Sequence, residues 1–136
     1  MVKTNAVHVY GSRKNSIARA TLSPGTGRVR INRMLLEHVE PEMSRLRIEE
    51  PIRMAGDLAK KVNINVNVSG GGWSSQSEAV RLAIAKAFVE YSKSEELRKH
   101  YLEFDRHLLV ADTRRKEQKK PNTHGRARAK RQKSYR

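Results

Sequence analysis

The sequence predicts an α/β (α+β) body over residues 1–110, followed by an extended basic tail over residues 111–136. Short runs of alternating apolar and polar residues indicate strands, and longer segments with apolar residues at helical spacing indicate helices. Positive charge is concentrated in the tail, which has few apolar side chains. A chain of 136 residues has room for one domain of ordinary size and not for a second independent core.

The N-terminal segment is predicted to form an antiparallel meander. Residues 7–10 alternate between valine and polar side chains, and a second β-like run covers residues 16–22, which indicates a hairpin with its turn at residues 11–15. The sequence Pro-Gly-Thr-Gly at residues 24–27 is a strong turn signal, and alternation resumes at residues 28–31. We therefore expect three strands that follow one another in space.

The clearest strand covers residues 62–68, where every even position is β-branched and every odd position is asparagine. Because side chains of a strand alternate between its two faces, one face is expected to be buried and the other solvated. A serine and three glycines at residues 69–72 end this strand.

Four helices are expected. Apolar residues between positions 34 and 39 indicate a short one, and Pro51 is suited to the first turn of a second, which continues to Ala59. A third starts at Ser75, with Glu78 at capping-box spacing, and a fourth starts at Ser94 with two glutamates in its first turn. The predicted buried stripe of the third helix consists of Val80, Ile84, Ala87, Phe88 and Tyr91.

The net charge of +15 makes nucleic acid the leading class of partner. Residues 111–136 hold eleven Lys or Arg against two acidic residues, a balance of +9, whereas the balance of the remaining 110 residues is only +6. Ordering a tail that buries no apolar surface costs about 1–2 kcal/mol per residue in backbone entropy. We therefore expect this segment to be disordered in isolation and to become ordered only on a polyanion.

Several classes of function are not supported. The chain contains no cysteine, and its five histidines are not paired at metal-ligand spacing, so we expect no disulfide, no metal site and no cofactor. No serine has an identifiable base and orienting acid, so we expect no enzyme and no small-molecule substrate. The N-terminus lacks an apolar signal core, and no apolar segment is long enough to span a membrane. A DNA-compacting chromatin-type protein and an RNA-modifying enzyme remain as alternatives.

Two loops of the body are candidate phosphate-binding sites. The hairpin turn presents Arg13 and Lys14, with Arg19 just beyond, beside small polar side chains that suit backbone-phosphate contacts, although a solvated turn would look the same. The glycine run between a strand and a helix N-terminus would let an anion approach backbone N–H groups, but the glycines could equally serve only to turn the chain. The candidate glycines are Gly70, Gly71 and Gly72.

Trp73 follows the glycines and could stack on a base, but packing against the body is the favoured expectation. The tail carries cations separated by small or polar residues, so that an extended chain can pass between phosphates, and Tyr135 near its end could stack on a base. The predicted RNA-binding residues of the tail are Arg114, Arg115, Lys116, Lys119, Lys120, Arg126, Arg128 and Lys130, followed by Arg131, Lys133, Tyr135 and Arg136.

The sequence resembles the universal small-subunit ribosomal protein nine family, called protein sixteen in the older eukaryotic scheme, over nearly its whole length. Its Val-His-Val-Tyr-Gly-Ser-Arg-Lys opening is most similar to the archaeal branch. The motifs that carry the resemblance are Gly-Ser-Arg-Lys-Asn-Ser-Ile-Ala-Arg at 11–19, Asn-Val-Asn-Val-Ser-Gly-Gly-Gly at 65–72, Gln-Ser-Glu-Ala-Val-Arg-Leu-Ala-Ile-Ala-Lys-Ala at 76–87, and the two basic runs at 112–120 and 130–136.

The resemblance implies a mixed four-stranded sheet with helices on one face, a fold similar to the second domain of small-subunit protein five. It also implies a structural, cytoplasmic protein in the head of the small ribosomal subunit, bound to the 3′ major domain of the rRNA and to neighbouring head proteins. The tails of family members extend toward the peptidyl-site tRNA, whose anticodon stem-loop phosphates lie near the terminal basic residue. Here the residues that match this role are Arg131, Lys133, Tyr135 and Arg136.

Overall fold

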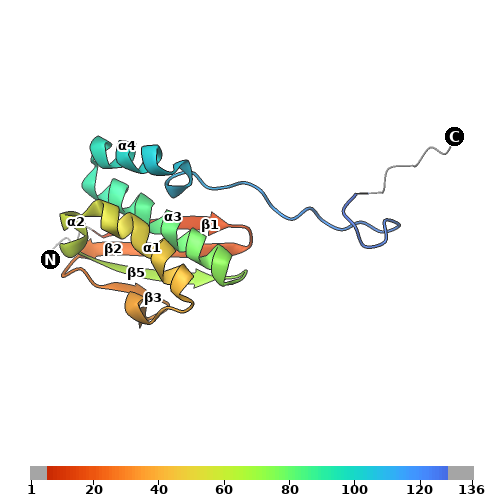
Figure 1. Cartoon of the computed structure of the whole chain (residues 1–136), viewed down its shortest axis with the longest axis horizontal. Coiled ribbons are helices and arrows are strands. Elements are labelled where there is room, and N and C mark those ends of the chain that lie inside the picture. Colours follow the sequence, from red (N-terminus) through yellow and green to blue (C-terminus); the bar gives the residue numbers. More distant parts are fainter. Residues whose placement is uncertain (1–5, 129–136) are drawn as a thin grey trace.

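The computed structural model describes residues 6–128 as an α+β body followed by an extended segment (Figure 1). The strands are β1 (Val7–Arg13), β2 (Ser16–Pro24), β3 (Val29–Ile31), β4 (Met34–Leu35) and β5 (Val62–Ser69). The helices are α1 (Glu42–Ala55), α2 (Asp57–Lys60), α3 (Trp73–Ser92) and α4 (Glu95–Phe104), with single 3₁₀ turns η1 (Leu36–His38) and η2 (Arg106–Leu108).

The strands form one mixed sheet in the order β1-β2-β5-β3-β4. The β1–β2 hairpin is antiparallel, as predicted, and β5 pairs antiparallel with β2 and parallel with β3. Two expectations are wrong. The sheet has five strands rather than four, because the two-residue β4 adds an edge. The predicted meander, in which β1, β2 and β3 would be neighbours in that order, is also wrong, because β5 lies between β2 and β3.

The loop between β2 and β3 passes across the N-terminal end of β5, so β2 and β3 are not adjacent strands. The N–H groups of Gly25 and Gly27 donate to Lys61 and Val62 carbonyls at 2.9 and 3.0 Å. The Asn63 side-chain oxygen accepts from Thr26 N and Arg28 N at 3.0 and 3.1 Å. These bonds fasten the Pro-Gly-Thr-Gly segment around β5, so the strong turn signal marks a bridge over one strand and not a tight hairpin.

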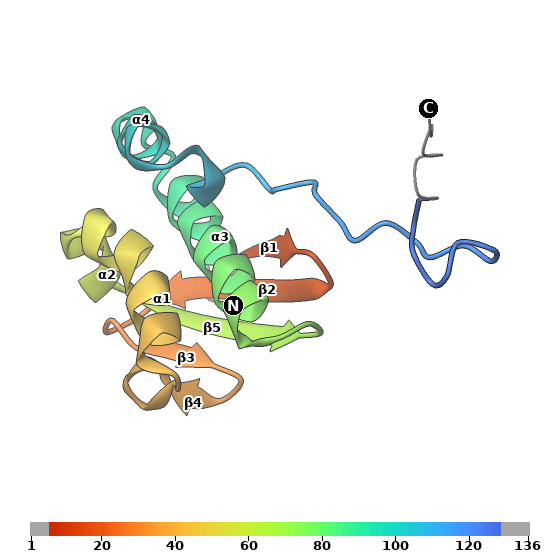
Figure 2. The same ribbon diagram turned by 45° about the vertical axis from the view of Figure 1, so that its right-hand side comes forward.

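The helices lie on one face of the sheet, where α3 packs across β1 and β2 and α1 packs beside α3 (Figures 1 and 2). The even positions of β5 are buried against them, as the alternation predicts. Of the predicted stripe of α3, four residues are fully buried and Tyr91 is partly buried. The core therefore lies between the sheet and this helical layer.

Two helix predictions in the central segment are wrong. Residues 34–38 form β4 and η1 rather than a short helix, because the left-handed residues Asn32 and Arg33 turn the chain back along β3. Pro51 lies inside α1 rather than at the start of a helix, and Gly56 separates α1 from α2. Pro51 is buried, and its carbonyl accepts a hydrogen bond from the buried Tyr101 hydroxyl at 2.7 Å, which ties α4 to α1 at this residue.

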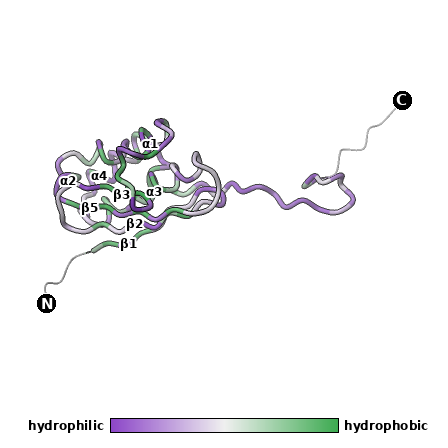
Figure 3. The backbone as a smooth tube through the Cα atoms, turned by 90° about the horizontal axis from the view of Figure 1, so that it is seen from below, coloured by the Kyte–Doolittle hydropathy of each residue, from purple (hydrophilic) through white to green (hydrophobic). Residues whose placement is uncertain are grey.

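The C-terminal part of the body follows its prediction closely. The Ser94 hydroxyl caps α4 by accepting from Leu97 N at 3.3 Å. Leu108 in η2 is fully buried, and after Asp112 the chain leaves the body as an extended segment (Figure 1). The described part of this segment is hydrophilic along most of its length (Figure 3).

Candidate RNA-binding surface

Three segments that are distant in the sequence meet around one open hollow of about 820 Å³. They are the β1–β2 turn, the glycine loop with the first turn of α3, and the first residues of the tail. The β1–β2 turn, the end of β5 and the start of the tail all lie at the same end of the body (Figure 1). We call this site the basic hollow; it is lined by Arg13, Lys14, Asn15, Gly71, Gly72, Trp73, Ser74, Ser75, Glu78, Arg114, Arg115 and Lys116.

The glycine loop has a structural requirement at two of its three glycines. Gly70 and Gly71 have φ values of +79° and +63°, a region that disfavours side chains. A Cβ at Gly70 would collide with the Asn15 carbonyl, and one at Gly71 with the Ser16 hydroxyl. Gly72 has ordinary backbone and open space around it. The loop conformation therefore requires glycine at positions 70 and 71. At position 72 it does not, because a side chain would fit there.

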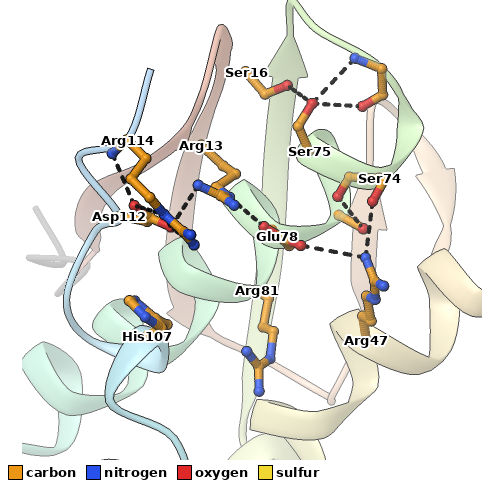
Figure 4. Close-up of polar contacts among 12 residues, drawn as sticks. Arg13, Ser16, Arg47, Ser74, Ser75, Glu78, Arg81, His107, Asp112 and Arg114 are labelled. Carbon is orange, nitrogen blue, oxygen red and sulfur yellow. Dashed lines mark hydrogen bonds and ion pairs between the residues drawn. The ribbon is translucent and has the colours of Figure 1, made fainter. Parts of the chain in front are cut away.

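Helix α3 begins at Trp73, two residues before the predicted start, and its cap differs from the predicted one. The Ser75 hydroxyl accepts from Gly72 N at 3.2 Å and lies 2.8 Å from the Ser16 hydroxyl (Figure 4). Glu78 takes no part in the cap, because its carboxylate faces arginines of other elements. The first turn of α3, whose leading N–H groups have no partner within the helix, lines the basic hollow with the positive end of the helix dipole.

Arg13 and Lys14 are neighbours with different environments. Arg13 Nε donates to Glu78 Oε2 at 2.6 Å, Arg13 Nη1 lies 2.7 Å from Asp112 Oδ2, and its side chain is only 18% exposed (Figure 4). Lys14 occupies the left-handed position of the turn, is exposed, and has no ion pair among residues 6–128. The turn therefore offers the solvent one free cation, Lys14, whereas Arg13 is engaged inside the protein.

An ion-pair cluster fixes the point where the tail leaves the body (Figure 4). Glu78 of α3 accepts from Arg13 and also faces Arg47 of α1 at 3.5 Å. Asp112 contacts Arg13 and accepts from the Arg114 guanidinium and backbone N–H at 2.7 and 2.9 Å. These hydrogen bonds from Arg114 hold the pKa of Asp112 well below its ordinary value. Glu78, expected only as part of a helix cap, and Asp112, to which no role was assigned from the sequence, are therefore the acidic residues that organise this cluster.

Beyond Arg114, the described tail exposes both free and paired cations. Lys120 and Arg128 both contact Glu117, at 3.3 and 2.9 Å. The predicted RNA-binding residues with no ion pair within residues 6–128 are Arg115, Lys116, Lys119 and Arg126. Lys130, Arg131, Lys133, Tyr135 and Arg136 lie outside the described residues.

Two further candidates lie elsewhere than expected. The Trp73 side chain is 53% exposed and borders both the basic hollow and a second hollow beside η1, so it packs against the body only in part. Arg19 points from β2 to the uncovered face of the sheet and is not a lining residue of the basic hollow.

Residues 6–128 contain no group of three acidic or histidine residues placed to hold a metal ion, and none of their helices is long and apolar enough to cross a membrane. A third hollow, beside the basic hollow, contains the carboxylates of Glu50 and Asp105. Both are bound to Arg81, at 2.6 and 2.8 Å. These carboxylates stabilise the packing of α1, α3 and η2 against one another.

Comparison with known proteins gives one consistent result. Residues 11–136 match the family model described as ribosomal protein S9/S16. The chain is 50% identical over 134 residues to small ribosomal subunit protein uS9 of Desulfurococcus amylolyticus, covering 98% of this chain and 95% of that protein. It is 53% identical over 127 residues to the protein of the same name from Halobacterium salinarum, covering 93% and 96%. The match to that of Methanococcus maripaludis is 44% over 131 residues, covering 96% and 98%.

These relatives are archaeal, as the opening motif predicts. The family model and the relatives together cover the body and the basic tail. They therefore show that the chain belongs to the ribosomal protein S9/S16 family, as a non-enzymatic protein of the small ribosomal subunit.

Proposed function

We propose that the chain is a structural protein of the small-subunit head that binds rRNA through the basic hollow and extends its tail along RNA toward the peptidyl-site tRNA. The observation that carries the proposal is the convergence around one hollow of the β1–β2 turn, the glycine loop and the first residues of the tail, 112–116, which we call the tail root. These segments are more than thirty residues apart in the sequence, and each contributes groups that bind phosphate.

The hollow supplies three kinds of RNA-binding group, two for phosphates and one for a base. Lys14, Arg115 and Lys116 provide cations that no acidic residue of the described chain neutralises. The first turn of α3 provides backbone N–H groups at the positive end of the helix. Trp73 provides an exposed ring on which an unstacked base can lie, which is a common mode of RNA recognition. RNA, rather than duplex DNA, also agrees with membership of a ribosomal family.

The ion-pair cluster gives the tail a defined starting direction. Because Asp112 is tied to Arg13 on β1, the chain leaves the body beside the basic hollow instead of at a variable angle. Residues 114–128 then continue the cationic surface away from the body. The extension to tRNA through Arg131, Lys133, Tyr135 and Arg136 rests on the resemblance to the family and is the part that needs the most direct test.

Salt dependence of rRNA binding tests the hollow. With about 6–10 phosphate contacts, the affinity of the full chain for a fragment of the 3′ major rRNA domain should fall roughly 10³–10⁵-fold between 50 and 200 mM salt. The triple variant K14Q/R115Q/K116Q should bind more weakly and should lower the slope of log K against log salt by about 2–3. Binding that does not respond to salt would contradict this mechanism.

A matched control separates local contacts from net charge. The variant R53Q/K60Q/R98Q removes the same three charges from helices α1, α2 and α4, where each cation already faces an acidic side chain. For this control, the slope of log K against log salt should differ from the wild-type slope by less than about 1. Equal losses in both triple variants would mean that total charge, and not the basic hollow, controls binding. Competition with duplex DNA, which should displace the rRNA fragment poorly, addresses the chromatin-type alternative.

Reconstituted subunits test the tail. Deletion of residues 127–136 should weaken retention of peptidyl-site tRNA and leave thermal unfolding of the body unchanged, because the tail buries no apolar surface. Replacing Arg136 by Ala should give a smaller loss of the same kind. A defect confined to subunit assembly would argue against contact with tRNA.

A further inference from the structure

The two layers of the body differ in charge. None of the five strands contains an aspartate or glutamate, so every acidic residue of the body lies on a helix or a connecting loop. Arginines on the helices face these acids: Arg45, Arg53 and Arg81 each have an ion pair. Arg19 and Arg30, on β2 and β3, have none among residues 6–128. The sheet layer therefore carries uncompensated positive charge.

The face of the sheet opposite the helices is uncovered within the described chain (Figures 1 and 2). Strand pairing arranges its side chains in rows, and two of these rows are polar, whereas a neighbouring row contains the exposed Ile17. One row runs from Tyr10 through Arg19 to Asn67, and the other runs from His8 through Thr21 and Asn65 to Arg30. All of these residues are exposed except Thr21, which is half-buried. We call the seven residues of these rows the open face.

The asparagines of β5 are unusual for a central strand, because asparagine is disfavoured in strands. Asn63 has a structural reason, since it holds the loop around β5. The side chains of Asn65 and Asn67 make no hydrogen bond with any described residue. Their amides are thus free to donate and accept toward a partner that lies on the sheet.

We propose that the open face binds a second segment of rRNA, distinct from the segment in the basic hollow. Arg19 and Arg30 flank β5 at two strand spacings, about 10 Å across the sheet and two residues apart along the strands, and would pair with phosphates. Asn65 and Asn67 lie between them and would bond to ribose hydroxyls and base edges. Tyr10, 66% exposed at the edge strand with Lys86 Nζ 5.5 Å from its ring centre, would stack on a base.

Charge favours RNA over a protein as the occupant. A protein interface buries an apolar centre and is depleted of charge there, whereas the centre of the open face is arginine and asparagine. The inference goes beyond the basic hollow, because it involves a different surface and different residues. If the test below finds a neighbouring ribosomal protein, and no RNA, on the open face, the inference is wrong.

Directed probing distinguishes the two surfaces. The chain has no cysteine, so the variants N67C and K14C each provide one attachment point for a tethered hydroxyl-radical source. In reconstituted subunits, the probe at position 67 should cleave rRNA at nucleotides different from those cleaved from position 14. Cleavage of no RNA from position 67, cleavage there of a neighbouring protein only, or cleavage of the same nucleotides from both positions would overturn the inference.

Salt titrations of the binding of the full chain to the 3′ major domain fragment provide an independent readout. The variant R19Q/R30Q should lower the salt slope by about 2 and leave the unfolding transition unchanged, because both side chains are exposed. The control R53Q/R98Q should leave the slope nearly unchanged. If the salt slope of R19Q/R30Q equals that of its control, the open face does not bind RNA, irrespective of the result for K14Q/R115Q/K116Q. If only the hollow variant has no effect, the proposed function fails and this inference stands.

Discussion

Arg13, the last residue of β1, and Lys14, the first residue of the β1–β2 turn, should respond in opposite ways to the same substitution. Arg13→Gln removes the partner of Glu78 at 2.6 Å and of Asp112 at 2.7 Å, whereas Lys14→Gln removes only a solvated cation. Both changes lower the net charge by one and keep an unbranched side chain. The pair therefore separates a role in organising the body from a role in binding RNA.

The structure sets the expected size of the stability effect. The Arg13 side chain is 18% exposed, but Glu78 is 37% exposed and keeps Arg47, and Asp112 keeps Arg114. The loss should therefore fall below the roughly 3–5 kcal/mol of an orphaned buried charge and above a surface pair, at about 1–2 kcal/mol. For a body of this size that is a fall in Tm of about 4–8 °C. Lys14→Gln should change stability by less than about 0.5 kcal/mol.

For RNA binding, Lys14→Gln should have the larger effect and Arg13→Gln the smaller, the reverse of their effects on stability. Lys14→Gln should lower the salt slope for the 3′ major domain fragment by about 1, and Arg13→Gln by much less. Urea unfolding followed by circular dichroism, together with salt titrations of binding, gives both quantities for each variant. The double variant R13Q/E78Q should lose less stability than the sum of its single variants, as expected for groups in contact.

One result would refute this reasoning. If Arg13→Gln left the free energy of unfolding unchanged and lowered the slope by about 1, Arg13 would be a phosphate ligand and the ion-pair cluster would not organise the tail root.

Further predictions follow from single contacts. Tyr101→Phe removes the buried hydroxyl that donates to Pro51 O and should cost about 1–2 kcal/mol in urea unfolding; an unchanged midpoint would contradict this. Gly71→Ala should destabilise the body, because of its positive φ and the Ser16 contact, whereas Gly72→Ala should be tolerated; equal Tm values would be inconsistent with the loop geometry. The pKa of Asp112 is lowered in the fold, so its contribution to stability is complete above about pH 4 and is lost as the pH falls further. The stability gap between the wild type and D112N should close over that acid range, and a gap that persists there would argue against the carboxylate.

Sequence patterns predicted the parts of the fold that depend on neighbouring residues. The alternation at residues 62–68 identified β5 and its buried side, and Ser94 marked the cap of α4. The candidate RNA-binding residues of the loops and tail also came from the sequence, because turns and basic runs are local features. Their role in binding stays a prediction. The charge imbalance between body and tail is likewise visible in composition alone.

Tertiary structure decided which of these pieces meet. The insertion of β5 between β2 and β3 depends on pairing over some forty residues, and no local pattern encodes which strands become neighbours. The same is true of charge: Arg13 and Lys14 look equivalent in the sequence, but only Arg13 finds acids from α3 and from the tail root. Whether a cation is free to bind RNA is set by where distant carboxylates lie, and the fold alone fixes that.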